Sequence, residues 1–410
     1  MKETKNVPQL RFSGFDDDWE EKKLNNYLEV STEKNFDNLF TKENVLSVSG
    51  EFGVVNQIAF QGRSFAGASL TNYKISDLES VIYTKSPLNA TPYGIIKANK
   101  FEKGIVSVLY AVYKTNNSDS KFIQDYFNLD ERLNNYLRPL ISKGAKNTIN
   151  VSDLEALEGI VTFPSLSEQQ KIGTFLSHVD SLIQAKTKKL ESLKAVKKSL
   201  LQKCFPRAGE KVPEMRFAGF SGDWEEKRLG EIITEIKRTD EKSNAPVMMI
   251  TAENGFINQS DRYSFNNAGQ SLKKYIVLEK FEMAYNHGAS KLRPFGSSFA
   301  LITEESARIP YVYHCFSTIE NPEFLSLVLN GKNTEDQLRK IVTSGARMDG
   351  LLNISFLEFS SIYVLIPPTI KEQEKIANFF SKYDSLISAQ QKEINKLKDI
   401  KKSLLQKMFV

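Results

Sequence analysis

The side chains most often used for metal binding and nucleophilic catalysis are scarce in this chain of 410 residues. It contains three histidines, His178, His287 and His314, and two cysteines, Cys204 and Cys315. None of them lies at a spacing typical of metal ligands, so we expect no metal site. Two unrelated cysteines form no disulfide framework and indicate a reducing cytoplasm.

Loops that bind nucleotides or methyl donors are also missing from the sequence. There is no Walker A loop and no Gly-x-Gly-x-x-Gly phosphate cradle. The string closest to an amino-methyltransferase loop, Asn321-Pro-Glu-Phe324, has Glu323 where a second proline belongs, and fits a helix start with Asn321 as cap. Asp349 and Glu358 could belong to a nuclease carboxylate set, but no clear pair of strands supports them. We therefore expect no catalytic residue and no cofactor.

The charge is unevenly distributed along the chain. The net formal charge is +5, whereas residues 165–205 carry +5 and residues 369–409 carry +4, so the remainder is acidic. If the chain binds nucleic acid, local basic patches or a partner subunit must neutralise the phosphate charge. The first residues lack an apolar signal region, and no apolar stretch approaches the ~20 residues that a membrane helix needs, so we expect no membrane segment.

The elements that would position a site are duplicated. Residues 7–24 match residues 212–229 at 12 of 18 positions, and residues 165–205 match residues 369–409 at 22 of 41 positions. The offset is 205 in the first match and 204 in the second, which is far longer than a solenoid repeat. Each copy is therefore a whole domain followed by a long segment, an arrangement suited to a partner with two half-sites.

Both long segments show helical periodicity with one narrow apolar seam. The predicted seam consists of Ile172, Phe175, Val179, Leu182, Leu190, Leu193 and Leu200 in the first helix, and Ile376, Phe379, Tyr383, Leu386, Ile394, Leu397 and Leu404 in the second. A helix of about 35 residues spans roughly 50 Å, and a seam so narrow usually pairs with a second helix. Lys186 and Gln390 interrupt the seams and can fix the register of the pair.

The segments between the repeated ends predict mixed α and β structure. Short β-rich runs are expected at 80–83, 106–112, 276–278, 299–303 and 309–316, and helical stretches near 119–140 and 322–342. We therefore expect an α+β chain of four parts: a first domain at 1–164, a central helix at 165–205, a second domain at 206–367 and a C-terminal helix at 368–410. The two domains are expected to be pseudo-symmetric, with the helices paired as an antiparallel coiled coil.

This organisation resembles the DNA-specificity (S) subunit of type I restriction-modification systems. The resemblance is carried by tandem variable domains, by a W-E-x-K-x-L block opening each copy, by a lysine-rich helix opening with E-Q-x-K-I, and by the ending K-K-S-L-L-Q-K-M-F. It covers essentially the entire chain. It implies two target recognition domains that read the halves of a split DNA sequence, and a helix pair that sets the gap between them.

The resemblance also implies partners. A non-catalytic specificity subunit binds double-stranded DNA and two modification (methyltransferase) subunits, and restriction (motor-nuclease) subunits join that core in the cytoplasm. S-adenosylmethionine, ATP and magnesium would then belong to the partner subunits.

Candidate DNA contacts follow from side-chain chemistry, since Arg, Lys, Asn, Gln, Ser and Thr read base edges and phosphates. In the first domain the candidates are Gln57, Arg63, Lys85, Ser86, Asn89, Thr91, Tyr93 and Lys146; in the second they are Gln259, Arg262, Asn286, His287, Ser290, Lys291, Arg293 and Arg347. Lys146 and Arg347 follow a Gly-Ala pair in both copies, which favours phosphate contacts. The loops at 85–93 and 286–293 differ between the copies and are better candidates for reading bases.

Two other functions remain open from the residues alone. The chain could be a coiled-coil scaffold whose variable domains bind proteins, or an unrecognised DNA-modifying enzyme. Salt-dependent binding to duplex DNA separates the scaffold from a DNA-binding subunit.

Overall fold

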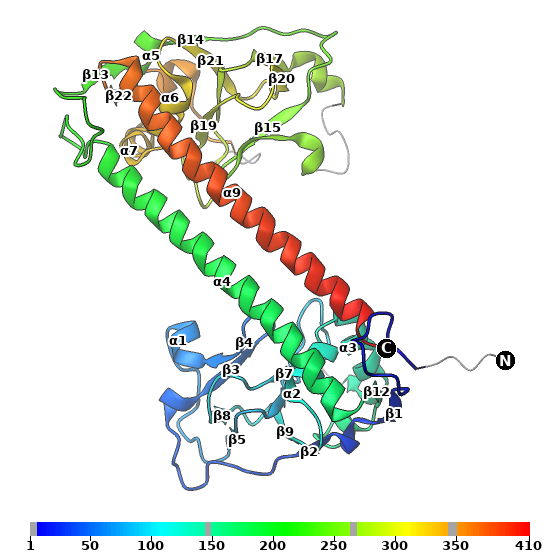
Figure 1. Cartoon of the computed structure of the whole chain (residues 1–410). Helices are drawn as coiled ribbons and strands as arrows, with labels where there is room; N and C mark the ends of the chain where they lie inside the picture. Colours follow the sequence, from blue (N-terminus) through cyan, green and yellow to red (C-terminus); the bar gives the residue numbers. More distant parts are fainter. Residues whose placement is uncertain (1–5, 144–148, 263–268, 343–350) are drawn as a thin grey trace. The chain divides into compact units, whose positions relative to one another are not determined.

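A computed structural model of the chain describes residues 6–143, 149–262, 269–342 and 351–410. The chain divides into two compact units, one built from residues 1–189 together with 390–410, and the other from residues 190–389. Each unit contains one mixed α/β domain, the start of one long helix and the end of the other. Figure 1 labels many of the elements of both units.

The centre of the first unit is a four-stranded antiparallel sheet in the order β2-β9-β6-β7. Its strands are β2 (Leu28–Val30), β9 (Ala111–Thr115), β6 (Val81–Tyr83) and β7 (Ile96–Ala98). The two-stranded sheets pair β1 (Glu20–Lys23) with β12 (Ile160–Phe163), β3 (Leu46–Ser49) with β4 (Gly53–Asn56), β5 (Lys74–Ser76) with β8 (Gly104–Val106), and β10 (Ser142–Lys143) with β11 (Ile149–Asn150). The short α-helices in the described part of this unit are α1 (Gln57–Gln61), α2 (Ser120–Tyr126) and α3 (Asp130–Leu137).

The second unit repeats this topology with a sheet in the order β14-β21-β18-β19. Its strands are β14 (Ile233–Glu235), β21 (His314–Thr318), β18 (Met283–Asn286) and β19 (Ser297–Ala300). The two-stranded sheets pair β13 (Glu225–Arg228) with β22 (Tyr363–Ile366), β15 (Met248–Thr251) with β16 (Gly255–Asn258), and β17 (Ile276–Glu279) with β20 (Ser306–Ile309). The short helices are α5 (Leu229–Ile232), α6 (Pro322–Leu329), α7 (Lys332–Ile341) and α8 (Phe356–Phe359). The variable segments thus share a topology despite their divergence.

Two expected strands are each interrupted by a turn. The run at 106–112 contains the end of β8, a turn closed by a hydrogen bond from Tyr110 N to Ser107 O (3.0 Å), and the start of β9. The run at 309–316 is divided in the same way by a bond from Tyr313 N to Pro310 O (3.0 Å). Apolar residues continue through both turns, so hydrophobicity alone could not reveal them.

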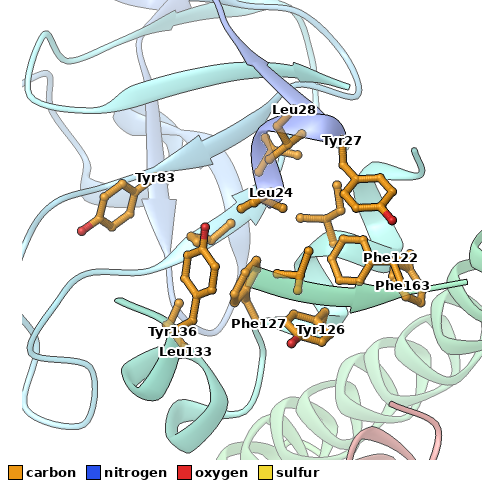
Figure 2. Packing of buried hydrophobic residues seen from close by; sticks show 14 of the residues in the cluster. Leu24, Tyr27, Leu28, Tyr83, Phe122, Tyr126, Phe127, Leu133, Tyr136 and Phe163 are labelled. Atoms are coloured by element: carbon orange, nitrogen blue, oxygen red, sulfur yellow. The ribbon is translucent and has the colours of Figure 1, made fainter. Parts of the chain in front are cut away.

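Each domain has its own apolar core, and the tryptophan that occurs in both copies lies in it. Trp19 is 2% exposed and packs edge-on against Phe122 and against Phe409 from the end of the C-terminal helix. Trp224 is 1% exposed and packs against Phe205 and Phe324. Figure 2 shows the aromatic rings of the first core gathered beside a long helix. Both tryptophans are therefore packing residues of their domains.

The two long helices are α4 (Leu166–Cys204) and α9 (Ile370–Lys407), and the same buried ion pair fixes the start of each. Arg11 donates from Nε and Nη2 to the two carboxylate oxygens of Glu168 at 2.7 and 2.8 Å. Arg216 makes the same two bonds to Glu372, also at 2.7 and 2.8 Å. Both carboxylate side chains are 1% exposed. The arginine pairs fork to fork with its carboxylate, a geometry in which charge-assisted bonds are strong.

The glutamine that follows each of these glutamates joins the long helix to its domain. Gln169 Oε1 accepts from Asp119 N at 3.1 Å, and Asp119 caps α2 by accepting from Phe122 N. Gln373 Oε1 accepts from Asn321 N at 2.9 Å. Asn321 caps α6, as expected from the sequence, by accepting from Phe324 N at 2.8 Å. The E-Q pair of each copy therefore positions a long helix and a domain helix together.

The long helices pack antiparallel. In the first unit Asp180 of α4 pairs with Lys401 of α9, and Lys186 pairs with Glu393 at 2.7 Å, so position increases along one helix as it decreases along the other. In the second unit Lys197 pairs with Asp384. Gln390 is 7% exposed, and its Nε2 donates to Lys186 O at 3.4 Å. The two polar residues that interrupt the seams thus meet each other, with the charge of Lys186 neutralised by Glu393.

The apolar seam differs from the expected set where two apolar residues stand side by side. Ile172, Leu190, Ile376 and Ile394 are buried, and Val179, Leu193, Leu200, Phe379, Tyr383, Leu397 and Leu404 are half-buried. Leu182 and Leu386 are 45% and 55% exposed, and the half-buried residue is the next one, Ile183 or Ile387. Phe175 is 37% exposed and packs edge-on against Phe12, whereas Leu176 beside it is 0% exposed. Steps of three and four both fit a helix, so the spacing could not choose between adjacent apolar residues.

Candidate nucleic-acid interface

The connections β6–β7 and β18–β19 contain the loops expected to read bases, and the two are closed in the same way. Tyr83 Oη donates to Tyr93 O at 2.6 Å, and Tyr285 Oη donates to Phe295 O at 2.6 Å. The next residues, Gly94 and Gly296, have φ values of +94° and +83°. A Cβ at Gly296 would lie 2.6 Å from Asn286 O, so this closure requires glycine. The two loops therefore have equivalent stems but different sequences.

Lys85, at the start of the first loop, is engaged inside the domain. Its Nζ donates to Val151 O at 2.8 Å and to Asp153 Oδ1 at 2.6 Å. Lys74 pairs with the other oxygen of the same carboxylate. Burial alone would raise the pKa of Asp153, but the bonds from Lys74 and Lys85 outweigh it and hold that pKa below its ordinary value. Lys85 therefore anchors the β6–β7 loop to the segment that follows β11.

His287, at the equivalent place in the second loop, is also engaged and only 7% exposed. Its Nδ1 lies 2.7 Å from Leu352 O and its Nε2 lies 2.7 Å from Val312 O. The His314 ring stacks on it at a centroid distance of 5.1 Å and an interplanar angle of 5°. Burial, followed by the charge of His287, lowers the pKa of His314, and a bond to Ile354 O opposes this. His287 thus joins three segments of the second domain.

Two more candidates of the second loop bond to backbone. Asn286 Nδ2 donates to Ile250 O at 3.0 Å, and its Oδ1 accepts from Gly288 N at 2.9 Å. Arg293 is half-buried and its Nη1 donates to Asn330 O at 2.6 Å. Burial lowers the pKa of Arg293 from its ordinary value. Both side chains shape the loop from within.

The polar side chains that remain at the loop surfaces are few. Asn89 and Lys291 are exposed and make no hydrogen bond or ion pair with any residue that the structure describes. Ser290 is exposed, with its Oγ accepting from Arg293 N at 3.0 Å. Ser86 and Tyr93 are half-buried, and Thr91 is 4% exposed. Asn89 and Lys291 are thus best placed to meet a ligand.

The other candidates lie near β4 and β16. Gln57 Oε1 accepts from Phe65 N at 2.7 Å and its Nε2 donates to Ser47 at 3.2 Å, so Gln57 organises its own turn. Arg63 lies over the Phe65 ring at 4.6 Å. Gln259 is half-buried and Arg262 is exposed. Lys146 and Arg347 lie outside the described residues.

Sequence reasoning missed the partners that hold Lys85 and His287. Asp153, Lys74 and the carbonyl groups of Val151, Val312 and Leu352 belong to segments distant in the sequence. One signal was available: Lys85 and His287 both follow an aligned strand at an offset of 202 residues. A residue able to carry positive charge occurs at the same structural position of both copies.

Among the residues described, no group of three or more His, Cys, Asp or Glu side chains could hold a metal ion. Within the same residues, no helix combines the length and the apolar character needed to span a bilayer.

Comparison with known proteins supports the resemblance found in the sequence. No family model matches the chain. A curated relative, the type I restriction enzyme MjaIX specificity subunit of Methanocaldococcus jannaschii, is 26% identical over 328 residues, which are 74% of this chain and 68% of the relative. The resemblance to type I specificity subunits is confirmed. The crystal structure of a type I S subunit from M. genitalium is 15% identical, covers 98% of this chain and 99% of its own, and has a TM-score of 0.56. The fold is therefore that of a specificity subunit.

One further structure, the HsdS subunit from Thermoanaerobacter tengcongensis, is 16% identical over 95% of this chain and 96% of its own, with a TM-score of 0.41.

Proposed function

We propose that this chain is the non-catalytic, sequence-specific DNA-binding subunit of a type I restriction-modification complex. In this proposal the domains at 1–164 and 206–367 each read one half of a bipartite target. The chain also docks two methyltransferase subunits, which restriction subunits then join. S-adenosylmethionine and ATP chemistry belong to those partners.

The observation that carries the proposal is the pair of loops on equivalent stems. Both are closed by a tyrosine hydroxyl and a positive-φ glycine, yet they present different side chains. Two readers of different half-sites need a shared scaffold and unshared contact residues. A scaffold protein that bound one partner twice would be expected to repeat its contact residues as well.

Genome-wide methylation mapping tests the proposal directly. DNA from cells that carry this chain with its methyltransferase should show a bipartite motif with a fixed gap. Cells that carry the methyltransferase alone should lack that motif. A protein scaffold without DNA specificity predicts no motif and no salt-dependent binding to duplex DNA.

We propose that Asn89 and Lys291 read bases and that Lys146 and Arg347 bind phosphates. Asn89→Ala or Lys291→Ala should relax discrimination at one position of one half-site by about 1–3 kcal/mol. Lys146→Ala or Arg347→Ala should weaken binding to all sequences and flatten the salt slope by about one unit. Competition binding with variants of each half-site measures both effects. Altered preference at the first half-site in Lys291→Ala would contradict separate reading.

Docking of two equivalent partners is supported by a surface that occurs in both copies. Phe12 meets Phe175 edge-on at 5.5 Å with Lys171 at 5.8 Å from the Phe12 ring. In the second copy Phe217 meets Phe379 at 5.4 Å with Lys375 at 5.7 Å from the Phe217 ring. The second surface borders a shallow hollow of about 380 Å³ that Lys371, Glu374 and Lys382 also line. The pair of rings and its lysine recur in both copies, which suits two copies of one partner.

Charge reversal tests this docking surface. Lys171→Glu should remove one methyltransferase subunit from the complex, Lys375→Glu the other, and the double variant both, as measured by native mass spectrometry. Lys382→Glu, at the edge of the hollow, serves as a milder control. DNA binding by the chain alone should be unaffected.

The helix pair is proposed to set the gap between the half-sites. Insertion of four residues after Lys188 in α4 and after the equivalent Lys392 in α9 should lengthen the gap in the methylation motif. An insertion in one helix alone breaks the pairing register and should mainly harm folding. A matched insertion that leaves the gap unchanged would argue against this role.

A further inference from the structure

The His287 ring faces two hydrogen-bond acceptors. Leu352 O lies 2.7 Å from Nδ1, and Val312 O lies 2.7 Å from Nε2. A carbonyl oxygen can only accept, and a neutral imidazole carries one N–H. Both contacts are hydrogen bonds only when the ring is protonated at both nitrogens. A neutral ring would place a lone pair against one of the carbonyl oxygens.

The backbone strengthens the same connection. Leu352 N donates to His287 O at 2.9 Å, and Gly288 pairs with Leu351 as an isolated bridge. The Nε2 contact reaches Val312 in the β20–β21 connection. The start of the β18–β19 loop is thus held both to the segment around Leu352 and to the β20–β21 connection. The His287 ring makes the contact with the β20–β21 connection.

The first domain makes the corresponding connection with lysine. Lys85 donates to Val151 O and Asp153, and an ammonium group offers three N–H donors without needing a further proton. Asp153 remains ionised because Lys74 and Lys85 hold its pKa below the ordinary value. The two domains therefore fix equivalent loops with side chains that differ in how they respond to pH.

We propose that His287 is a positioning residue whose protonated ring fixes the reading loop of the second domain, so that recognition of the second half-site weakens as pH rises while recognition of the first, fixed by Lys85, does not. This inference rests on the function proposed above. His287 itself is buried and touches no base in this scheme. It acts through the placement of Ser290 and Lys291.

The groups around His287 are compatible with a charged ring. His314 stacks on it from β21, and burial lowers the pKa of that ring, which favours its neutral form. Tyr285 on β18, with a ring centroid 6.1 Å away, has its pKa raised by burial and is uncharged. Glu235 on β14 acts on His314 and adds negative charge nearby. Among the described residues, no carboxylate bonds to the His287 ring, so the two carbonyl groups are its acceptors.

The test measures discrimination at each half-site across pH in the complete complex with methyltransferase subunits. Binding to the mapped target and to variants altered in one half is compared from about pH 6 to pH 8.5, a window around neutral pH, at constant ionic strength. Asn89→Ala and Lys291→Ala assign each half to its domain. Loss of one buried charge-assisted bond should lower discrimination at the second half-site by about tenfold at high pH. The first half-site should change by less than about twofold.

Variants test whether His287 causes the pH dependence. His287→Lys carries the side chain of the first domain and should bind independently of pH. His287→Gln has N–H donors on only one atom of its amide and an acceptor oxygen on the other, and should behave at every pH like the wild type at high pH. His314→Gln should retain the pH dependence, as should His178→Gln, an exposed histidine on α4. Should His287→Gln or His287→Lys fail to fold, NMR of the His287 ring nitrogens in the wild-type chain replaces them, and a neutral ring at pH 6 overturns the inference.

The outcomes distinguish the inference from the proposed function. A complex that shows no sequence preference at any pH refutes both. Sequence-specific binding whose pH dependence is equal in the two halves, or survives in His287→Gln, refutes the role of His287 and leaves the proposed function intact.

Discussion

At the start of each long helix the two copies make the same contacts, whereas at the ends of β6 and β18 they make different ones. Arg11–Glu168 and Arg216–Glu372 agree in their atoms and distances. Lys85 and His287 occupy equivalent places but use different chemistry to hold a loop. The agreement identifies what both copies must do, namely fix a domain on a helix. The divergence identifies where each copy has its own task.

The largest expected effect comes from breaking a shared contact. Glu168→Ala should leave the partly buried Arg11 unpaired and cost about 3–5 kcal/mol of unfolding free energy in the first unit. Glu372→Ala should cost the second unit about the same. Denaturant unfolding, monitored by hydrogen exchange of amides in each unit, measures the unfolding free energies of the two units separately. A control, Glu214→Ala, removes the exposed Arg207 and Lys203 pairs and should cost far less, because exposed ion pairs contribute little to stability. Unequal costs for Glu168 and Glu372 would contradict the equivalence of the copies.

The glutamines beside these glutamates should reveal a smaller asymmetry. Gln169 Nε2 donates to Pro164 O at 2.9 Å. Gln373 Nε2 donates to Pro367 O at 3.3 Å and, in addition, to Glu320 Oε2 at 2.7 Å. Glu320 in turn pairs with Lys227 at 3.1 Å. Because charge-assisted bonds are stronger, Gln373→Ala should cost about 1 kcal/mol more than Gln169→Ala. Thermal unfolding of the two variants provides the comparison, and equal costs would show that the bond to Glu320 adds nothing.

A charge cluster in the first unit includes residues whose equivalents in the second copy are uncharged. Lys121, Asp125 and Asp180 form ion pairs beside Lys97, and the residue equivalent to Lys97 in the second copy is Phe299. Burial, with the charge of Lys401 as the next cause, lowers the pKa of Lys97 to about 8. An unfolded lysine titrates near 10.4. From about pH 8 to 10 the unfolded chain therefore binds more protons than the folded one, and the first unit should gain stability as pH rises through this range.

Replacement of this lysine tests the comparison. Lys97→Met should stabilise the first unit near pH 7 by on the order of 1 kcal/mol, because a charge no longer has to be desolvated. It should also remove the rise in stability above pH 8. Phe299→Met, the matched change in the second unit, should mildly destabilise and add no pH dependence. Melting temperatures measured between pH 7 and pH 10 test both expectations. If the stability of Lys97→Met still rises above pH 8, a group other than Lys97 causes the rise.

How much the sequence could predict depended on how local the determining contacts are. The long helices, the cap at Asn321 and the interruption of the seams at Lys186 and Gln390 follow from periodicity and spacing within a few residues. The choice of Leu176 over Phe175, or Ile183 over Leu182, depends on packing against other segments. The internal roles of Lys85 and His287 depend on carbonyl groups more than 20 residues away. Residue type predicted a DNA contact at both positions, because a lysine that binds phosphate and one that binds a carbonyl look alike in sequence.

The smallest expected effect concerns the helix pair, to which each copy contributes one long helix. Gln390 is buried in the seam and gains only one long bond, 3.4 Å to Lys186 O, so leucine there should raise the stability of the first unit by about 1 kcal/mol or less. The same change should weaken the specification of register, since an all-apolar seam no longer favours one pairing. Spin labels at the exposed positions 182 and 398 report the register through their distance distribution. In Gln390→Leu that distribution should broaden while the melting temperature rises slightly, whereas Gln391→Leu, beside it, should leave the width unchanged. A stabilised variant with an unchanged width would mean that the ion pairs Asp180–Lys401 and Lys186–Glu393 already fix the register, and that Gln390 carries only a cost.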